Sequence, residues 1–228
     1  MFVTKEMPRS LSAEAYRSLR TSIKFSSIDK PIKTIVVTSS IMGEGKSTVV
    51  GNLAHVFNQD GARVLVIDCD LRKPAMHYNF FISNREGITD VLIGNTDLKS
   101  VIKKIDNSLF LITAGTIPPN PAEVLSSKKM SQFIESIKDD YDYIFIDTPP
   151  VGIDASIISS YSDGVIFVVG SNEVDKNLAK LAKERLDSVN ANILGVILNK
   201  FKADVNNEYY SYDYYGQDDT QNKKRKRK

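Results

Sequence analysis

The stretch KTIVVTSSIMGEGKST, residues 33–48, decides the fold. Its first half is a continuous run of β-branched residues, which is expected of a strand buried on both faces of a parallel sheet. Gly43 and Gly45 follow, and they let the backbone curl so that its N–H groups point inward. A helix then begins at Lys46, and its N-terminus adds partial positive charge. A strand, a glycine-rich turn and a helix in this order predict a phosphate-binding loop.

The residues of this loop have expected roles. Lys46 can reach the β- and γ-phosphates of a nucleotide, and the Ser47 hydroxyl can bind Mg²⁺. We expect Lys46 to lie at a solvent-facing helix start. Ser40 stands where such loops usually have their first glycine, so an ordinary glycine-rich turn is the alternative. The nucleotide-binding residues are predicted to be Gly43, Glu44, Gly45, Lys46, Ser47 and Thr48.

Strands and helices alternate on both sides of this stretch. Strands are predicted over 33–40, 62–70, 107–115, 141–150, 163–171 and 191–200, and helices over 46–61, 121–140 and 173–190. We expect Asn120 to cap the second of these helices, with Pro121 at its first position and Glu123 closing a capping box. This alternation predicts an α/β fold, a doubly wound and mostly parallel sheet covered by helices on both faces.

The chain is predicted to form one domain with a segment at each end. Residues 1–29 hold an N-terminal arm and a helix with apolar residues at helical spacing, and Ser12 is its expected N-cap. The nucleotide-binding domain is expected over 30–201. Periodicity ends there, so residues 202–228 are predicted to be a flexible tail.

The positive charge is concentrated at the C-terminus. The whole chain has 30 basic and 28 acidic residues, a net charge of +2. The last six residues, KKRKRK, are all basic, so the remainder holds 24 basic residues against 28 acidic ones. The main part of the chain is therefore not predicted to bind nucleic acid. The basic run itself could hold phosphate or anionic lipid, or only keep the chain in solution.

Composition excludes several other classes. No apolar run approaches the roughly 20 residues of a membrane helix, and no apolar segment of a secretory signal is present at the N-terminus. The single cysteine, Cys69, excludes an internal disulfide framework and indicates a cytoplasmic protein. His55 and His77 are expected to be packing or surface residues, which leaves little for a zinc site.

Three aspartates stand where predicted strands end. Asp68 and Asp70 are two apart and are expected to share a strand face, while Asp147 ends another strand. Each alone would be a turn or cap residue, but all three should meet the phosphate loop at the edge of the sheet that binds ligands. Three adjacent carboxylates repel one another, and Mg²⁺ would remove that conflict. Cys69, between two of them, is expected to point into the core.

Together these segments resemble the bacterial tyrosine kinases (BY-kinases), in the cytoplasmic form of Gram-positive capsule and exopolysaccharide systems. VIDCDLR, residues 66–72, is similar to the Walker A′ motif of that family, and IFIDTPP, residues 144–150, to its Walker B motif. AGTIPPNPAEVL, residues 114–125, is also typical of the family. The resemblance covers residues 10–228.

The resemblance implies phosphoryl transfer from MgATP to tyrosine hydroxyls and a role in capsule synthesis and export. It implies that Asp68 accepts the proton of the phenol, whose pKa of about 10 leaves it protonated at neutral pH. Asp70 and Asp147 would then organise Mg²⁺ with Ser47, and Lys46 would stabilise the transferring phosphate. Strand periodicity alone does not separate Asp68 from Asp70.

Two further residues are weaker candidates for phosphate contact. These are Arg72 and Lys73, which follow the second aspartate of the Walker A′ segment.

Glu14, Arg17 and Arg20 match the oligomerisation motif Glu-x-x-Arg-x-x-Arg of the family. Their spacing alone predicts only a solvated, salt-bridged helix face.

The segment NNEYYSYDYYGQ, residues 206–217, holds half of the ten tyrosines of the chain and no Leu, Ile, Val or Phe. Burial therefore does not explain it. The resemblance implies that these tyrosines are phosphorylated between subunits of a ring: Tyr209, Tyr210, Tyr212, Tyr214 and Tyr215. It also implies a separate transmembrane activator that recruits the kinase to the inner face of the membrane.

Two other functions fit parts of the sequence. A partition or placement ATPase of the MinD/ParA kind would share the nucleotide motifs, but such proteins usually carry a lysine at the position of Ile41. A nucleotide-binding scaffold that docks through its basic tail would need no catalysis. The tyrosine cluster favours the kinase.

Overall fold

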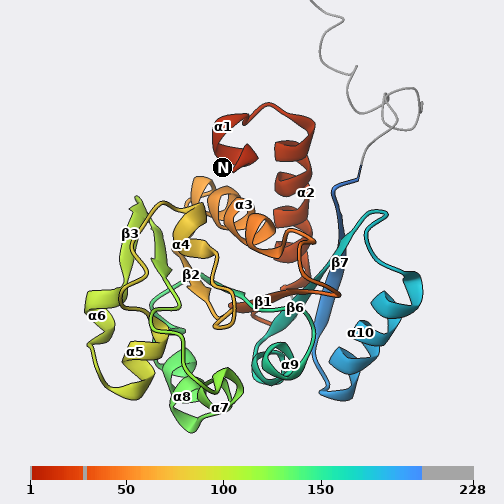
Figure 1. Cartoon of the computed structure of the whole chain (residues 1–228). Coiled ribbons are helices and arrows are strands. Elements are labelled where there is room, and N and C mark those ends of the chain that lie inside the picture. Colours follow the sequence, from red (N-terminus) through yellow and green to blue (C-terminus); the bar gives the residue numbers. More distant parts are fainter. Residues whose placement is uncertain (1, 28–29, 202–228) are drawn as a thin grey trace, which may run out of the picture.

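The computed structural model describes residues 2–27 and 30–201. Within these residues one sheet of seven strands crosses the molecule in the order β3-β4-β2-β5-β1-β6-β7 (Figure 1). Every neighbouring pair is parallel except β3 with β4. The strands are β1 (Thr34–Ser39), β2 (Val64–Asp68), β3 (Lys103–Asp106), β4 (Leu109–Ile112), β5 (Tyr143–Asp147), β6 (Gly164–Gly170) and β7 (Ile193–Asn199). The predicted doubly wound, mostly parallel sheet is confirmed.

Helices cover both faces of this sheet (Figure 1). One face carries α1 (Val3–Glu6), α2 (Leu11–Ser26), α3 (Lys46–Gln59) and α4 (Met76–Asn79). The other carries α5 (Ile88–Ile93), α6 (Leu98–Val101), α7 (Pro121–Leu125), α8 (Lys128–Ile137), α9 (Ile153–Ser159) and α10 (Lys176–Ser188). In the described ranges no helix has the length and apolar character needed to cross a membrane.

The two faces of β1 show why its sequence is apolar throughout. Ile35 and Val37 pack into the core beneath α3, whereas Val36 lies in the core on the opposite side. All three side chains are fully buried. Because successive side chains of a strand point to opposite faces, a strand between two helical layers needs apolar residues at every position. The central strands are therefore continuous apolar runs in the sequence.

The N-terminal arm packs on α3. The Phe2 ring lies so close to Gly51 that a Cβ at Gly51 would meet it at 1.9 Å. The backbone N–H and the hydroxyl of Thr4 both donate to Asn52 Oδ1 at 3.0 Å. Helix α2 then begins after Ser10, whose hydroxyl accepts from the N–H of Ala13 at 3.2 Å. The expected N-cap, Ser12, is therefore wrong by two residues.

The predicted helix over 121–140 is divided in the structure. Helix α7 ends at Leu125, and Ser127 caps a new helix, α8, by accepting from the N–H of Met130 at 3.2 Å. The expected capping box does not form, because Asn120 donates through Nδ2 to the Glu123 side chain at 3.2 Å instead of capping the backbone. Strand β3 was not predicted, because its lysine-rich sequence at the sheet edge is only half-buried.

Both histidines have packing roles among the described residues. His55 is buried against the rings of Phe2 and Phe80, with centroid separations of 5.1 and 5.9 Å. Burial, together with the nearby charge of Lys5, lowers the pKa of His55 from 6.5 to about 4. The ring of His77 lies against Tyr78 at 3.9 Å. Both positions agree with the expected packing or surface roles, and the absence of a catalytic role stays a prediction.

Candidate active site

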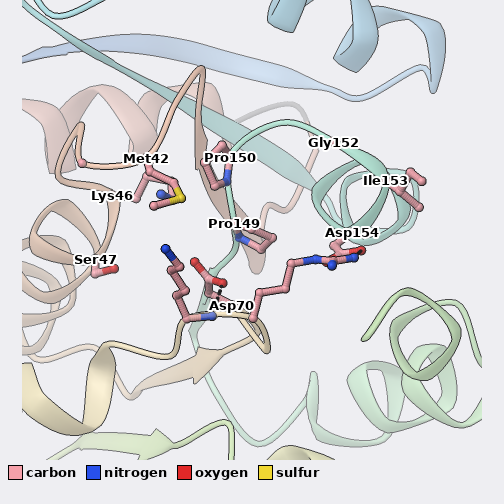
Figure 2. A pocket seen from close by; sticks show the side chains of 12 residues that line it. Met42, Lys46, Ser47, Asp70, Pro149, Pro150, Gly152, Ile153 and Asp154 are labelled. Atoms are coloured by element: carbon pink, nitrogen blue, oxygen red, sulfur yellow. Dashed lines mark hydrogen bonds and ion pairs between the residues drawn. The ribbon is translucent and has the colours of Figure 1, made fainter. Parts of the chain in front are cut away.

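A cavity of about 530 Å³ opens beside the phosphate loop (Figure 2). Three segments line it: the loop itself, the turn after β2, and the segment between β5 and α9. In Figure 2, Lys46 and Ser47 lie on one side, Ile153 and Asp154 on the other, and Asp70 between them. The lining residues are Met42, Gly43, Lys46, Ser47, Asp70, Arg72, Lys73, Pro149, Pro150, Gly152, Ile153 and Asp154.

The loop has the curled backbone that the sequence predicts. Gly43 and Gly45 both have a φ of +89°, in the left-handed region that favours glycine. At Gly45 a side chain is also excluded by space, because a Cβ would lie 2.3 Å from Asn199 Nδ2. The loop therefore keeps its shape only with glycine at this position.

Glu44, between these two glycines, is fully buried and holds the loop in place. Its Oε1 accepts from the N–H of Gly170 at 2.7 Å, and its Oε2 accepts from the N–H of Ile41 at 2.8 Å. Its backbone carbonyl accepts from Asn199 Nδ2 at 2.7 Å. Any contact of Glu44 with a nucleotide would therefore come from its backbone, since its carboxylate is buried and already binds the end of β6 and the N–H of Ile41 within the loop.

The role of Asn199 was not predicted from the sequence. Asn199 is the last residue of β7, so it lies at the same sheet edge as the strand-end aspartates. The signal that indicated those aspartates, a polar residue at the end of a predicted strand, is present here too. What the sequence does not reveal is its partner, 155 residues earlier in the chain.

Lys46 is buried, with only 7% of its surface exposed, so the expected solvent-facing position is wrong. It lies at the first position of α3, beneath the curl of the loop and beside carboxylates. Its charge lowers the pKa values of Asp70 and Asp147, against the larger opposite effect of burial. The next residue, Ser47, donates from Oγ to Asp147 Oδ2 at 2.6 Å.

Asp147 is fully buried at the end of β5, directly beside Asp68 of β2. Burial raises the pKa of Asp147 well above its usual range, and the charge of Asp68 raises it further. Among the described residues Asp147 Oδ1 has no hydrogen-bond partner. A buried carboxylate oxygen without a donor is costly, and a bound cation or its water shell would remove that cost.

Asp68 and Asp70 do not share surroundings, although both were expected on one strand face. The strand ends at Asp68, so the alternation of strand side chains no longer applies at Asp70. Asp68 is fully buried and accepts from three backbone N–H groups, those of Asp70, Ala75 and Met76, at 3.2, 3.0 and 2.9 Å. Asp70 lines the cavity instead, and its Oδ1 accepts from the N–H of Lys73 at 3.0 Å.

Burial raises the pKa of both carboxyl groups. The pKa of Asp68 is raised to about 7, despite the three N–H donors that lower it. Burial also raises the pKa of Asp70, against the N–H of Lys73 and the charge of Lys46. Between them Cys69 is fully buried in the core beneath the opposite helical layer, which confirms its expected direction.

Arg72 forms an ion pair that the sequence did not indicate. Its Nε and Nη2 donate to the two carboxylate oxygens of Asp154 at 2.6 and 3.1 Å. Asp154 lies in the first turn of α9 and is buried, whereas 55% of the Arg72 side chain remains exposed. This fork holds the guanidinium at the wall of the cavity. The two residues are 82 positions apart, so no local pattern links them.

The aspartates do not form a metal cage on their own. Within residues 2–27 and 30–201 no group of three or more His, Cys, Asp or Glu side chains is arranged to hold a metal ion. Mg²⁺, however, is usually bound by one or two protein groups together with waters and phosphate oxygens. Ser47, Asp70 and Asp147 fit this mode of binding, because Asp147 Oδ1 lacks a donor and Asp70 faces the cavity.

The residues of the predicted oligomerisation stripe on α2 have different surroundings. Arg17 pairs with Glu14 at 2.6 Å on the exposed face of the helix. Arg20 instead binds α3, donating to the Val56 carbonyl at 3.0 Å and pairing with Asp60 at 3.4 Å. The five tyrosines predicted as phosphorylation sites lie outside the described residues.

Comparisons with known proteins agree with this site. A sequence model described as an AAA domain matches residues 32–194. The tyrosine-protein kinase YwqD of Bacillus subtilis is 42% identical over 215 residues, which cover 93% of this chain and 90% of YwqD. The chain belongs to the bacterial tyrosine-protein kinases. It is a tyrosine-protein kinase of the capsule and exopolysaccharide type, and its phosphate loop is a nucleotide-binding loop.

Solved structures place this kinase within the wider fold. The chimerical protein CapA2B2 is 35% identical, with a TM-score of 0.86 over 89% of this chain and 90% of that one. The septum site-determining protein MinD of Pyrococcus horikoshii matches with a TM-score of 0.63, over 73% of this chain and 70% of that one. At 24% identity, MinD shares the fold alone. The chain therefore belongs to the kinase family, and its likeness to MinD does not extend beyond the fold.

Proposed function

We propose that this kinase phosphorylates its own tyrosine cluster, residues 209–215, with MgATP as donor, and thereby controls the assembly that regulates capsule synthesis and export. The observation that carries the proposal is the cavity where Lys46, Ser47 and Asp70 meet beside the curled loop. A nucleotide held by the loop would present its γ-phosphate there, and the open side of the cavity leaves room for a tyrosine.

The reaction makes one bond and breaks one bond at phosphorus, and the phenolic proton passes from the tyrosine to a carboxylate. The tyrosine Oη bonds to the γ-phosphorus, the bond from that phosphorus to the oxygen shared with the β-phosphate breaks, and ADP leaves. Lys46 stabilises the negative charge on the transferring group, and the loop N–H groups hold the phosphates. When bound, Mg²⁺ would neutralise charge on the β- and γ-phosphates, held by Ser47, Asp70 and Asp147, mostly through waters.

Two carboxylates compete to accept the phenolic proton. We assign this role to Asp68, as the resemblance to the family implies. A pKa raised to about 7 suits a group that must take up a proton near neutral pH. Asp70 is the competitor, because it lines the cavity whereas Asp68 is covered by the turn over residues 70–76. Under the assignment to Asp68, this turn moves or a water carries the proton.

We further propose a ring of subunits joined through Glu14, Arg17 and Arg20, in which each active site takes the tail of a neighbour. Each phosphotyrosine adds a charge of about −1.5 to −2 at neutral pH. Five of them would outweigh the six basic residues at the C-terminus. Phosphorylated tails would then repel one another and leave, which dissolves the ring.

A separate transmembrane activator completes the proposal. It would bind this cytoplasmic kinase, hold it at the inner face of the membrane and supply part of its activation. The family resemblance supports this arrangement, and so does the likeness to the chimerical protein CapA2B2. Protein tyrosines other than those of the tail would be further substrates, and nucleic acid is not an expected partner.

One experiment tests the activity and shows whether transfer occurs within one chain or between chains. Purified protein is incubated with MgATP and probed for phosphotyrosine; a partition ATPase would release phosphate without labelling, and a scaffold would do neither. A second sample mixes Lys46→Met protein that keeps its tail with active protein truncated after Lys202. Label on the inactive chain supports transfer between subunits. An unlabelled inactive chain, with wild-type labelling at a rate independent of concentration, would show transfer within one chain.

A further inference from the structure

The cavity has a second half that the nucleotide does not require. Its first half is the phosphate loop with Lys46 and Ser47, and the second half is formed by the turn after β2 and the segment that leads into α9. Figure 2 shows these two sides separated by Asp70. The acceptor must approach the γ-phosphate from the side that the loop leaves open, so this second half is where the acceptor would lie.

The walls of this half suit an aromatic ring. Pro149 and Pro150 line it, and Ile153 stands at its edge with 71% of its surface exposed. Met42, on the phosphate loop, lines the other side of the same cavity with 58% exposed. Exposed apolar side chains that gather beside a cavity are suited to contact a bound ligand. A phenol ring between them would bury apolar surface and leave its hydroxyl at the polar floor.

The rim of the same half is positively charged. The Arg72 guanidinium is fixed there by Asp154, which occupies two of its donor groups and leaves the others available. Lys73 is exposed. Its backbone N–H donates to Asp70 Oδ1, and this hydrogen bond fixes the Lys73 backbone at the rim. The charge of Asp154 is balanced by Arg72, and the charge of Asp70 by Lys46 and the proposed metal. The charge of Lys73 is not balanced in this way, so the rim has a net positive charge.

The tyrosine cluster carries the opposite charge. In residues 206–217, NNEYYSYDYYGQ, Glu208 and Asp213 are the charged residues, and no basic residue is present. Each of the five tyrosines lies within two positions of one of these carboxylates. Two residues of extended chain span about 7 Å, so a tyrosine in the cavity would bring a carboxylate to the rim.

We propose that Lys73 and Arg72, with Met42 and Ile153, form an acceptor subsite that selects tyrosines flanked by carboxylates. This inference rests on the proposed function and names the class of substrate that the site prefers. It also implies an order of events: a phosphotyrosine brings a stronger negative charge than Glu208 or Asp213, so the first transfer makes the neighbouring tyrosines better acceptors.

The test uses the full chain and reverses charge on each side. The initial rate of phosphotyrosine formation is compared between the native tail and a tail with Glu208→Lys and Asp213→Lys, each in the wild-type and Lys73→Glu backgrounds. Reversing two exposed charge pairs is expected to slow labelling about tenfold. Lys73→Glu should restore labelling of the reversed tail and slow labelling of the native tail. Lys99→Glu, an exposed lysine outside the cavity lining, is the matched control and should change neither rate.

A second variant, Lys73→Ala, controls for the case in which Lys73→Glu disturbs folding. Lys73→Ala should bring the two tails closer in rate without inverting their order, and the preference in wild type should shrink as salt is added. Equal labelling of native and reversed tails by a wild-type chain that forms phosphotyrosine would overturn the subsite and leave the proposed function standing. ATP hydrolysis without phosphotyrosine on either tail would overturn the proposed function, and the subsite with it.

Discussion

The Asn199 side chain donates a hydrogen bond of 2.7 Å to the backbone carbonyl of Glu44, between the two left-handed glycines of the phosphate loop. The end of β7 thus helps to set the shape of a loop that follows β1. The Glu44 carboxylate adds a bond to Gly170 at the end of β6. Two strand ends therefore position the loop that holds the phosphates.

Asn199→Ala should weaken nucleotide binding more than it weakens the fold. The loop loses one of its fixed points, so we expect a raised KM for ATP, while the free energy of unfolding falls by about 1 kcal/mol for one hydrogen bond. Asn192→Ala is a matched control, because Asn192 Nδ2 donates to the Asp163 carbonyl, also at 2.7 Å, just before the same strand. An equal KM in the two variants would show that Asn199 does not position the loop.

Lys46→Met should abolish transfer while the protein stays folded. Methionine has a similar length and can fill the buried space, but it leaves the transferring phosphate without its cation. We expect autophosphorylation to fall at least about a hundredfold, measured with anti-phosphotyrosine antibody, and the melting curve to stay cooperative. Lys99→Met, on the surface, should label normally. Near-wild-type labelling in Lys46→Met protein would refute the role of this residue.

The three aspartates should differ in their dependence on Mg²⁺. Asp70→Asn and Asp147→Asn should raise the Mg²⁺ concentration needed for half of the maximal rate, because each removes a charged group that would face the ion or its waters. Asp68→Asn should lower the rate even at saturating Mg²⁺, since it removes the proposed base. Identical Mg²⁺ titrations for the three variants would mean that this division of roles is wrong.

The pair of Glu14 and Arg17 on α2 should control assembly with only a small effect on stability. Glu14→Ala with Arg17→Ala should lower the mass measured by light scattering, because it removes part of the proposed subunit contact. The ion pair contributes at most about 1 kcal/mol to the fold, and Arg17 also donates to the Pro8 carbonyl, so the free energy of unfolding should fall by no more than about 2 kcal/mol. The matched control removes another exposed helical pair, Lys183 and Asp187 on α10, and should keep the wild-type mass.

Arg20 differs from Glu14 and Arg17 because it joins α2 to α3. Arg20→Ala removes its hydrogen bond to the Val56 carbonyl, so it should lower the free energy of unfolding by about 1 kcal/mol in addition to any effect on mass. Urea unfolding of the monomeric protein would measure this loss. If Arg20→Ala unfolds like wild type, the contact with α3 contributes nothing to stability.

His55 should make the protein less stable in mild acid. Its pKa is lowered from 6.5 to about 4 by burial, so in this window the unfolded chain binds a proton that the folded chain does not. The contribution of His55 to the free energy of unfolding should therefore fall as pH drops from 6.5 towards 4, by at most about 1.4 kcal/mol for each pH unit. The raised pKa values of Asp68, Asp70 and Asp147 act in the opposite direction over the same window, because these groups take up protons more readily in the folded chain. Below 4 the contribution of His55 no longer changes with pH.

Replacing the imidazole tests this explanation. His55→Phe keeps an aromatic ring against Phe2 and Phe80 and should remove this loss. Its free energy of unfolding relative to wild type should therefore rise as pH drops from 6.5 to 4, measured by urea unfolding at a series of pH values. His77, whose pKa is also lowered by burial, and the three aspartates are present in both proteins, so they do not account for this difference. A profile with the wild-type slope in His55→Phe would assign the acid sensitivity to other groups.

Local patterns in the sequence were sufficient for most of the fold. Buried strands such as β1 and β5 are continuous apolar runs, and the order of strand, glycine-rich turn and helix located the phosphate loop. The rule that ligands bind beyond the carboxyl ends of parallel strands then indicated Asp70 and Asp147. These features depend on residues close together in the chain, so a single sequence contains them.

The features that were missed depend on distant contacts or on where an element stops. The ion pair of Arg72 with Asp154 and the hydrogen bond from Asn199 to Glu44 join residues far apart in the chain. Asp68 and Asp70 were placed on one face because β2 was expected to continue, but it ends at Asp68. Burial of Lys46 follows from the closed curl of the loop, which its spacing does not reveal.

The bond from Asn199 to Glu44 also bears on the order in which a newly made chain becomes active. Its two residues are 155 positions apart, and Gly170, the strand-end partner of the Glu44 carboxylate, is 126 positions away. During synthesis from the N-terminus, the phosphate loop leaves the ribosome long before β6 and β7 exist. We expect a nascent chain that stops before residue 199 to bind nucleotide poorly, so that the kinase gains its donor only once the sheet is complete.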